Sequence, residues 1–126
     1  MKYDKKILII EDEEIMSGAL FDKFTKEGFN VVVGKDGEDG LEKARTEKPD
    51  FIITDIVMPK IDGITVMKKI REENILPETP IIILTNLSDP ESIADAAAYN
   101  ASFLVKTDWK LNDIVSIVKE KMGIKD

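Results

Sequence analysis

Four short apolar runs in this chain end in residues that could carry out chemistry. In chain order these residues are Glu11 and Asp12, Asp55, Thr85, and Lys106. In an open α/β sheet, ligands bind beyond the carboxyl ends of the strands, so these side chains are expected to converge on one edge. The sequence therefore predicts a pocket that contains carboxylates, one hydroxyl group and one ammonium group.

This set of side chains suits phosphoryl chemistry. Carboxylates held within a few ångströms repel one another, so such a cluster needs raised pKa values or a bound cation. Mg²⁺ suits it because this ion prefers oxygen ligands and usually keeps several waters. The ion would also screen an incoming phosphoryl group, so that a carboxylate could act as nucleophile and form an acyl phosphate. The Lys106 ammonium would pair with one or more phosphoryl oxygens, and the Thr85 hydroxyl would donate a hydrogen bond to another phosphoryl oxygen.

Each residue also has a purely structural interpretation. Asp12 could cap the helix that follows it, and Asp55 could be a turn residue at a strand end. Glu13 and Glu14 are interpreted as first-turn acids that interact favourably with the helix dipole. Thr85 could be an ordinary strand residue, and a lone lysine is usually solvated. The functional interpretation gains weight because four separate strand ends agree.

The composition excludes several classes of site. The 126 residues include no Cys and no His, so disulfides, thiol nucleophiles, Ser-His-Asp triads and histidine metal clusters are excluded. The net charge of −7 disfavours a general electrostatic role on nucleic acid or on anionic lipid. No apolar stretch has the length of a signal peptide or a membrane span, so we expect a soluble, cytoplasmic protein.

The apolar pattern predicts the fold class. Five apolar runs are rich in β-branched residues and too short for helices, which is typical of strands buried on both faces. They span residues 7–10, 31–33, 51–53, 81–84 and 103–105. Segments with helical spacing separate them, and this alternation predicts a parallel sheet between two helical layers. We expect one α/β domain over residues 1–126.

The sequence predicts inward-facing residues for four helices, and for the remaining helix, the fourth along the chain, it predicts where the helix begins. The expected inward residues are Ile15, Ala19, Leu20 and Phe24 in 13–28; Leu41 and Ala44 in 36–47; Ile64, Met67 and Ile70 in 64–74; and Leu111, Ile114, Val115, Val118 and Met122 in the last helix. Gly28 is expected to cap the first of these helices at its C-terminus. Asp89-Pro90-Glu91 predicts the start of another helix, because it offers a capping carboxylate followed by proline.

The chain resembles the receiver domain of bacterial two-component response regulators over essentially its whole length. The most specific segment is residues 52–63, where the aspartate Asp55 is followed by Met-Pro and then by Asp-Gly. The Glu11-Asp12 pair resembles the acidic pair of that family. Thr85, Phe103 and Lys106 match its remaining positions in order. This resemblance implies a flavodoxin-like, chemotaxis-regulator-like sheet of five parallel strands in the order 2-1-3-4-5, with helices on both faces.

The resemblance implies a role for each site residue. Asp55 would accept a phosphoryl group from the phosphohistidine of a sensor histidine kinase or phosphotransfer protein. Mg²⁺ would be held by Asp12, Asp55 and the backbone carbonyl of Val57, with Glu11 acting through a water. Thr85 and Lys106 would contact the phosphoryl group. Thr85 would then turn inward and Phe103 would follow, which alters the face of helix four, strand five and helix five for an output partner.

Several residues depart from the commonest family pattern. Glu11 stands where aspartate is more usual, which lengthens the reach to a metal. Thr107 follows Lys106 where a cis proline is typical, and a cis bond without proline would cost about 2.5 to 4 kcal/mol. Asn86 stands where a small residue is common, so its bulk would narrow access to Asp55. Phe103 lacks a phenolic hydroxyl, so it could switch only through burial.

Two apolar residues lead to a prediction about the lifetime of the phosphoryl group. Val57 and Leu87 lie, in the family, where the hydrolytic water approaches. Neither side chain can orient a water as Asn, Gln or Glu could. We therefore predict a long-lived phosphoryl group.

The resemblance also bears on partners and on competing functions. It implies no direct binding of nucleic acid or membrane by this domain, no enzymatic activity beyond its own phosphorylation and dephosphorylation, and a monomer or a phosphorylation-dependent dimer through helix four, strand five and helix five. We expect a stand-alone receiver or a fragment of a larger regulator. Thr107 and Asn86 leave a phosphorylation-independent pseudo-receiver as an alternative. An aspartyl-nucleophile phosphohydrolase is disfavoured, because Asp12-Glu13-Glu14 lacks the Asp-x-Asp pattern.

The sequence leaves two surfaces open. The segment 93–99 is alanine-rich, and it could either present small side chains to a partner or pack tightly on the sheet. Trp109 could be a core anchor or an exposed contact.

Overall fold

The computed structural model describes residues 2–124 and shows alternating strands and helices. The strands are β1 Lys6–Ile10, β2 Asn30–Gly34, β3 Phe51–Thr54, β4 Ile81–Thr85 and β5 Ser102–Val105. The helices are α1 Glu14–Glu27, α2 Gly37–Glu47, α3 Gly63–Glu72, α4 Pro90–Ala98 and α5 Leu111–Lys121. A short 3-10 helix, η1 Lys106–Asp108, follows β5. All five predicted strands are confirmed, each lengthened by one or two residues.

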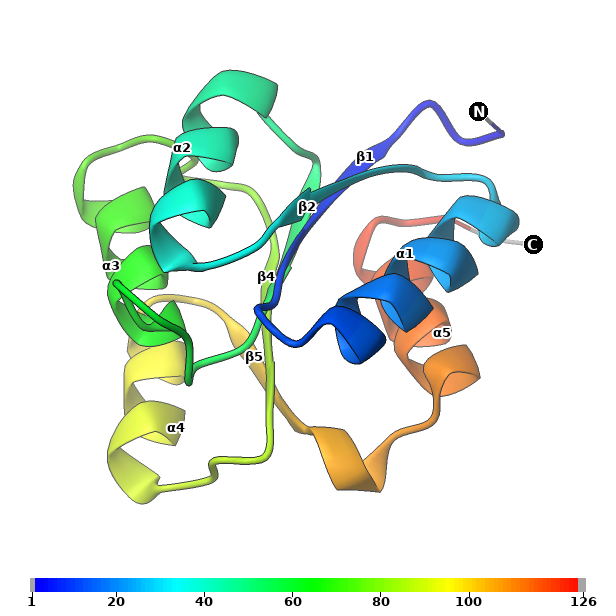
Figure 1. Cartoon of the computed structure of the whole chain (residues 1–126). Helices are drawn as coiled ribbons and strands as arrows, with labels where there is room; N and C mark the ends of the chain where they lie inside the picture. Colours follow the sequence, from blue (N-terminus) through cyan, green and yellow to red (C-terminus); the bar gives the residue numbers. More distant parts are fainter. Residues whose placement is uncertain (1, 125–126) are drawn as a thin grey trace.

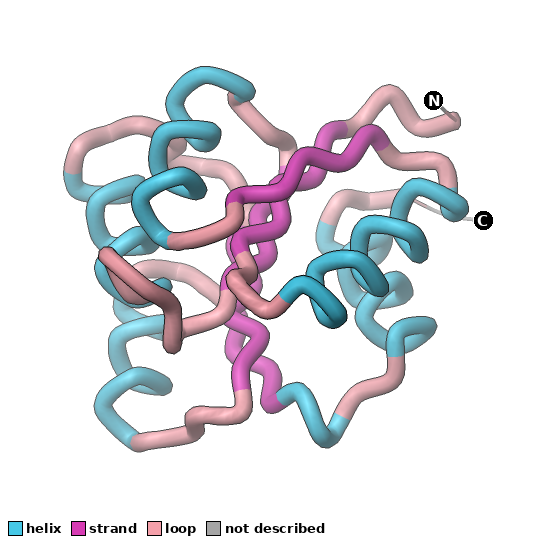
Figure 2. Tube along the Cα trace, viewed as in Figure 1, coloured by secondary structure: helices cyan, strands magenta, loops and turns pink. Residues whose placement is uncertain are grey.

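The strands form one parallel sheet in the order β2-β1-β3-β4-β5, as predicted. Figure 1 shows this sheet nearly edge-on, with α1 and α5 on one face and α2, α3 and α4 on the other. The tube in Figure 2 shows the same three layers, with the strands stacked between the helices. Every residue of β3 and β4 is buried, whereas the edge strands β2 and β5 are only partly buried. This pattern is expected when helices cover both faces of the sheet.

The two faces of the sheet carry separate hydrophobic cores because side chains alternate along a strand. Ile7 and Ile9 of β1 pack with α1 and α5, whereas Leu8 and Ile10 pack on the side of α2 and α3. The predicted inward residues of α2, α3 and α5 line these cores, with Leu111 and Met122 only partly buried. The fold therefore follows directly from the period-two pattern of the strands.

Carboxylates begin three of the helices. Asp36, Asp62 and Asp89 each accept a hydrogen bond from the backbone N–H three residues later, at the starts of α2, α3 and α4. Each bond satisfies a donor that a helix start would otherwise leave unpaired. The predicted start at Asp89-Pro90 is thus confirmed. Gly28, with φ of 108°, caps the C-terminus of α1, also as predicted.

One predicted core residue is wrong. Ile15 is 86% exposed, while Leu20 and Phe24 of the same helix are buried and Ala19 is only partly buried. Ile15 precedes Phe24 by nine residues, which places it about 180° round a helix of 3.6 residues per turn. Met16 packs against the core instead, since it lies four residues before Leu20 on the same stripe.

Helix length and apolar character decide whether a helix could cross a membrane. Across residues 2–124, no helix is both long enough and apolar enough to cross a bilayer.

Candidate functional site

A pocket of about 280 Å³ lies at the carboxyl edge of the sheet. Its walls come from the loops that follow β1, β3, β4 and β5. The lining residues are Glu11, Asp12, Glu13, Asp55, Val57, Thr85, Asn86, Leu87 and Lys106. The structure thus brings together every predicted site residue except Phe103.

Lys106 joins the two buried carboxylates of this pocket. Its Nζ lies 2.7 Å from Glu11 Oε1 and 2.8 Å from Asp55 Oδ2. The side chains of Glu11, Asp55 and Lys106 are 3%, 11% and 15% exposed, so water screens their charges only weakly. One ammonium group therefore balances part of the charge of the acidic pair.

Burial and pairing shift the pKa values of two of these groups. Burial raises the pKa of the Glu11 carboxyl, and the nearby charge of Asp55 adds to this, against the lowering effect of the hydrogen bond from Lys106. Burial alone would lower the pKa of Lys106. Hydrogen bonds and charge from Asp55 and Glu11 outweigh it, so the pKa of Lys106 is raised and the side chain stays cationic.

The backbone around Asp55 is held by its neighbours. The Thr54 hydroxyl donates to the Asp55 carbonyl at 2.9 Å, and the Ile56 N–H donates to Asp55 Oδ1 at 2.6 Å. A Cβ on Gly63 would lie only 1.8 Å from that same Asp55 carbonyl oxygen. Thr54 and Gly63 are thus positioning residues that sequence reasoning missed. The only sequence signal for this role is the Asp62-Gly63 step, which is typical of a tight turn.

Thr85 and Phe103 take different positions relative to the pocket. Thr85 is fully buried, and its Oγ1 accepts a hydrogen bond from the Leu87 N–H at 3.2 Å. Phe103 lies two residues into β5, is partly buried, and packs against the core under α3 and α4. It does not line the pocket, so any coupling to Asp55 would pass through β4, which pairs with β5 at Ile83.

The residues after Glu11 separate into different roles. Glu13, not Asp12, is the N-cap of α1, and it makes no side-chain cap. The helix-cap interpretation of Asp12 is therefore wrong: this side chain is exposed and lines the pocket. Glu14 lies in the first turn of α1, as predicted.

The mouth of the pocket is apolar on two sides. Val57 is 65% exposed and Leu87 is 42% exposed, and both line the pocket. Asn86 is exposed beside them. The Lys106–Thr107 peptide bond is not cis, and the chain turns there through η1 instead. Trp109, just beyond, is an exposed residue rather than a core anchor.

The donor set of the pocket fits a hard divalent cation. Glu11, Asp12 and Asp55 all line it, and they supply the carboxylate oxygens that Mg²⁺ prefers. Within the described part of the chain, no group of three acidic residues is yet arranged as a closed metal cage. Lys106 bridges Glu11 and Asp55, whereas the Asp12 side chain is exposed.

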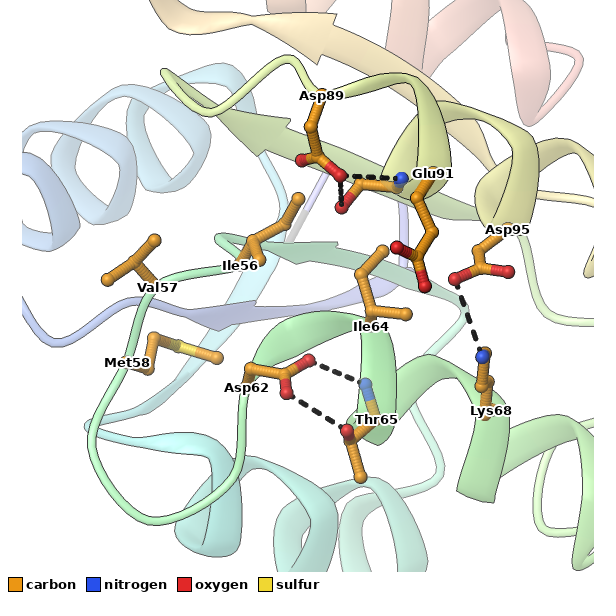
Figure 3. A pocket seen from close by; sticks show the side chains of 11 residues that line it. Ile56, Val57, Met58, Asp62, Ile64, Thr65, Lys68, Asp89, Glu91 and Asp95 are labelled. Atoms are coloured by element: carbon orange, nitrogen blue, oxygen red, sulfur yellow. Dashed lines mark hydrogen bonds and ion pairs between the residues drawn. The ribbon is translucent and has the colours of Figure 1, made fainter.

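A larger cavity, of about 470 Å³, lies beside this pocket between α3 and α4 (Figure 3). Three of the four acids that line it serve the local structure. Asp62 and Asp89 cap the two helices, and Asp95 pairs with Lys68 at 3.4 Å. It holds no paired carboxylates of the kind found around Lys106, so its size does not make it the functional site.

Known proteins are similar to this chain in sequence. The family model of the response regulator receiver domain matches residues 7–119. A curated relative, the response regulator ArlR of Staphylococcus aureus, is 33% identical over 90% of this chain and 51% of its own length. The alkaline phosphatase synthesis transcriptional regulatory protein PhoP of Bacillus subtilis is 43% identical over 65% of this chain and 33% of its own length. The chain thus spans between a third and about half of these relatives.

Solved structures agree with the fold. A CheY-like receiver domain from Methanospirillum hungatei superposes with a TM-score of 0.89 at 22% identity, covering 95% of this chain and 94% of its own, which bears on fold alone. A CheX–CheY complex with BeF3 and Mg from Borrelia burgdorferi matches with a TM-score of 0.84 at 28% identity. The match covers 94% of this chain and 89% of the other chain.

What such domains do is known in outline. Receiver domains of two-component systems are phosphorylation switches that use Mg²⁺ and interact with histidine kinases and output domains. The match covers most of the chain, and the pocket carries an aspartate, a lysine and a threonine from the ends of three strands. This chain therefore belongs to the response regulator receiver domain family.

Proposed function

We propose that this chain is a signalling switch in which Asp55 accepts a phosphoryl group from the phosphohistidine of a sensor histidine kinase or phosphotransfer protein. The observation that carries the proposal is the position of Asp55. It lies at the centre of the sheet edge, is only 11% exposed, and is held by Lys106 at 2.8 Å. A partly buried carboxylate beside an ammonium group can approach a phosphate dianion, which an isolated carboxylate would repel.

The transfer is a displacement at phosphorus. A carboxylate oxygen of Asp55 forms the new P–O bond while the P–N bond to the donor histidine breaks. The leaving nitrogen keeps the electron pair of that bond, and because the other ring nitrogen already carries a proton, the histidine leaves as neutral imidazole and the receiver needs no acid of its own. Bound Mg²⁺, held by Asp12, Asp55 and the Val57 carbonyl with Glu11 acting through a water, would screen the charge of the phosphoryl oxygens.

The residues around Asp55 would orient the phosphoryl group and would change position when it is bound. Lys106 is the cation that can move from Glu11 to a phosphoryl oxygen, and Thr85 has a hydroxyl within the same pocket. The Thr85 oxygen accepts a hydrogen bond from the Leu87 N–H, so a turn toward the phosphoryl group would pull on the β4–α4 loop. Phe103 would move with it, which would alter the face formed by α4, β5 and α5 for an output partner.

The proposal extends to cellular role. The domain would act as a cytoplasmic switch and would catalyse only its own phosphorylation and dephosphorylation. Its net charge of −7 supports partners other than nucleic acid or anionic membrane. It would be a monomer, or a dimer that forms through α4, β5 and α5 on phosphorylation.

Beryllofluoride, a mimic of an acyl phosphate, tests this function. Calorimetry of the full chain with beryllofluoride and Mg²⁺ is expected to show saturable binding. Asp55→Asn removes the nucleophilic carboxylate and should abolish binding. Asp62→Asn is a matched control, because it changes an aspartate in the same loop, one that caps α3, and Asn caps a helix about as well. Binding that survives in Asp55→Asn would contradict the proposal.

A further inference from the structure

The loop between β3 and α3 reaches from the pocket to α2. Its first half carries Val57, which lines the pocket. Its second half carries Lys60 and Ile61, which line a different cavity, of about 570 Å³, together with residues at the start of α2. Figure 3 shows Val57 on the arm of this loop that leaves β3 and Asp62 on the arm that returns to α3. The same loop thus borders the pocket on one arm and α2 on the other.

Lys60 has an unusual backbone conformation. Its φ is 72°, and the Ile61 N–H donates to the Pro59 carbonyl at 2.9 Å across it. These two features define a γ-turn with positive φ, which is rare and strained. Lys60 lies at no helix end, so its neighbours must hold it in this conformation. Three further non-glycine residues with positive φ do lie where helices end, a common place for it, and they are Lys48, Asn74 and Asn100.

The start of α2 holds this turn. Gly37, the first residue of α2, lies so close to the loop that a Cβ there would be 1.8 Å from the Ile61 carbonyl oxygen. The Lys60 ammonium also lies 3.9 Å from Asp36 and 3.6 Å from Glu38. The Lys60 side chain is 56% exposed, so these ion pairs contribute little. The backbone contact at Gly37 is therefore the stronger constraint from α2.

A stiff stretch of chain connects the turn to the pocket. Only Met58 and Pro59 separate Lys60 from Val57. Proline has a fixed φ, and the residue before a proline is restricted to extended conformations. A change of φ at Lys60 is therefore passed on to the backbone of Val57.

We propose that Gly37 and the γ-turn at Lys60 are positioning elements of the phosphorylation site, in which α2 holds the loop in a strained turn and the turn sets the place of the Val57 carbonyl. The inference rests on the proposed function, in which that carbonyl holds Mg²⁺. Neither Gly37 nor Lys60 lines the pocket, so both act on it through the backbone. The conformation of the turn, and not the charge of Lys60, then determines the Mg²⁺ affinity.

Two substitutions at one position separate conformation from charge. Lys60→Gly and Lys60→Val both remove the ammonium group, but glycine adopts positive φ readily and a β-branched residue resists it. Calorimetry of the full chain is expected to show a Mg²⁺ affinity within about threefold of the wild type for Lys60→Gly, the rescue variant. Lys60→Val should lose about tenfold, the lower end of what removal of outer-shell support costs a metal site.

Gly37→Ala tests the contact from α2. Alanine favours a helix over glycine, so a purely local effect would stabilise α2. The new Cβ instead displaces the Ile61 carbonyl, and the Mg²⁺ affinity should again fall about tenfold. Gly18→Ala is the matched control, because nothing lies within 4 Å of a Cβ there, and it should leave the affinity unchanged.

The titrations distinguish failure of the inference from failure of the proposed function. A merely structural role would lower the free energy of unfolding of Lys60→Val and Gly37→Ala but leave the Mg²⁺ affinity of the folded proteins unchanged, and this result would overturn the inference alone. Equal losses in Lys60→Gly and Lys60→Val would also overturn it, because the turn conformation would then not matter. If the wild type binds no Mg²⁺, the proposed function fails, and the inference with it.

Hydrogen exchange without metal tests the turn itself. The Ile61 amide, which donates across the turn, should exchange slowly in the wild type and in Lys60→Gly, and faster in Lys60→Val. Lys60 is an exposed residue, so its two variants are expected to fold, and they decide the question if Gly37→Ala does not fold. Exchange of Ile61 in Lys60→Val that is as slow as in the wild type would overturn the inference.

Discussion

At the scale of single residues, the backbone carbonyl of Asp55 is held in place by its neighbours. Thr54 donates to it, and Gly63 leaves room for it at the start of α3. The proposed nucleophile is thus oriented through its own backbone. A catalytic side chain gains from such support because small displacements of a reacting group slow a reaction strongly.

Gly63→Ala should therefore destabilise the protein. The new Cβ would lie 1.8 Å from the Asp55 carbonyl oxygen, so the loop must shift, at a cost of about 1–3 kcal/mol in the free energy of unfolding. Gly18→Ala is the matched control, because nothing lies within 4 Å of a Cβ there. In mid-helix it should stabilise by about 0.5–1 kcal/mol. Urea unfolding measures both, and equal effects would contradict the account.

The apolar mouth of the pocket predicts a slow loss of phosphate. Val57 and Leu87 are exposed beside Asp55, and neither can hold an attacking water by a hydrogen bond. We expect Val57→Asn and Leu87→Glu to accelerate dephosphorylation of the isolated domain. The decay of labelled protein after removal of the donor gives the rate. Rapid loss from the wild type that neither substitution speeds would refute this prediction.

Glu11 should make stability depend on pH. Its pKa is raised in the folded state, so the folded protein holds this proton more tightly than the unfolded chain does. The corresponding stability is fully present below about pH 4.5, the ordinary value, and is lost as pH rises through the folded pKa. Relative to Glu11→Gln, the wild type should lose stability over this interval in metal-free buffer. Denaturant titrations at several pH values in this interval measure the free energy of unfolding. Equal pH dependence in the wild type and in Glu11→Gln would contradict this prediction.

The residues of the site were predictable from the sequence, but their partners were not. Glu11, Asp55, Thr85 and Lys106 follow apolar runs, and the ends of parallel strands must meet at one edge. The bridge from Lys106 to both acids depends on rotamers and burial, which no spacing records. Repulsion between the acids predicts a bound cation from the sequence, and in the structure Lys106 already compensates part of their charge.

At the scale of elements, the strands were predictable because burial on both faces leaves continuous β-branched runs. Helix faces were harder to predict. Ile15 is apolar but lies on the opposite side of α1 from Phe24, so apolar character alone does not place it in the core. The alanine-rich segment of α4 partly packs on the sheet and partly presents small side chains to solvent. Ala96 is buried, while Ala94, Ala97 and Ala98 are exposed.

One element-scale contact left no trace in the sequence. Arg71, near the end of α3, donates to the carbonyls of Tyr99 at 3.1 Å, Leu76 at 2.7 Å and Asn100 at 3.3 Å. It ties the end of α3 to the residues that follow α4. Backbone carbonyls exist at every position, so no residue pattern marks them as partners. The consequence is an α4 that is anchored at its C-terminal end.

Loss of Arg71 should loosen that anchor. Arg71→Ala removes three hydrogen bonds from a charged donor, and we expect a loss of about 2–4 kcal/mol in the free energy of unfolding. Arg71→Lys should recover only part of this free energy, since a lysine side chain cannot donate to the three carbonyls in the fixed directions of a guanidinium group. Hydrogen exchange of the amides of residues 97–101 should quicken.

The only other arginine of the chain serves as the control. Arg45 pairs with Glu73 at 3.0 Å, and both side chains are nearly half exposed. Arg45→Ala should cost less than about 1 kcal/mol. A cost for Arg71→Ala no greater than this would show that α4 is not anchored through Arg71.

At the scale of the whole molecule, one sheet with two cores gathers four loops at a single edge. The proposed chemistry lies in the pocket where the loops after β1, β3, β4 and β5 meet, while the α4, β5 and α5 surface extends away from it. Coupling between the two regions has a short route, because Thr85 in the pocket and Phe103 in β5 lie on adjacent paired strands. The family match over residues 7–119 covers both regions.

The central claim is that Asp55 is the phosphoacceptor, and site mapping after reaction with acetyl phosphate tests it most directly. The full chain would be incubated with acetyl phosphate and Mg²⁺, and the modified residue located by mass spectrometry of its peptides. The account predicts a single modification on Asp55 that requires Mg²⁺ and disappears in Asp55→Asn. Modification of another acidic residue, or none in the presence of Mg²⁺, would contradict it.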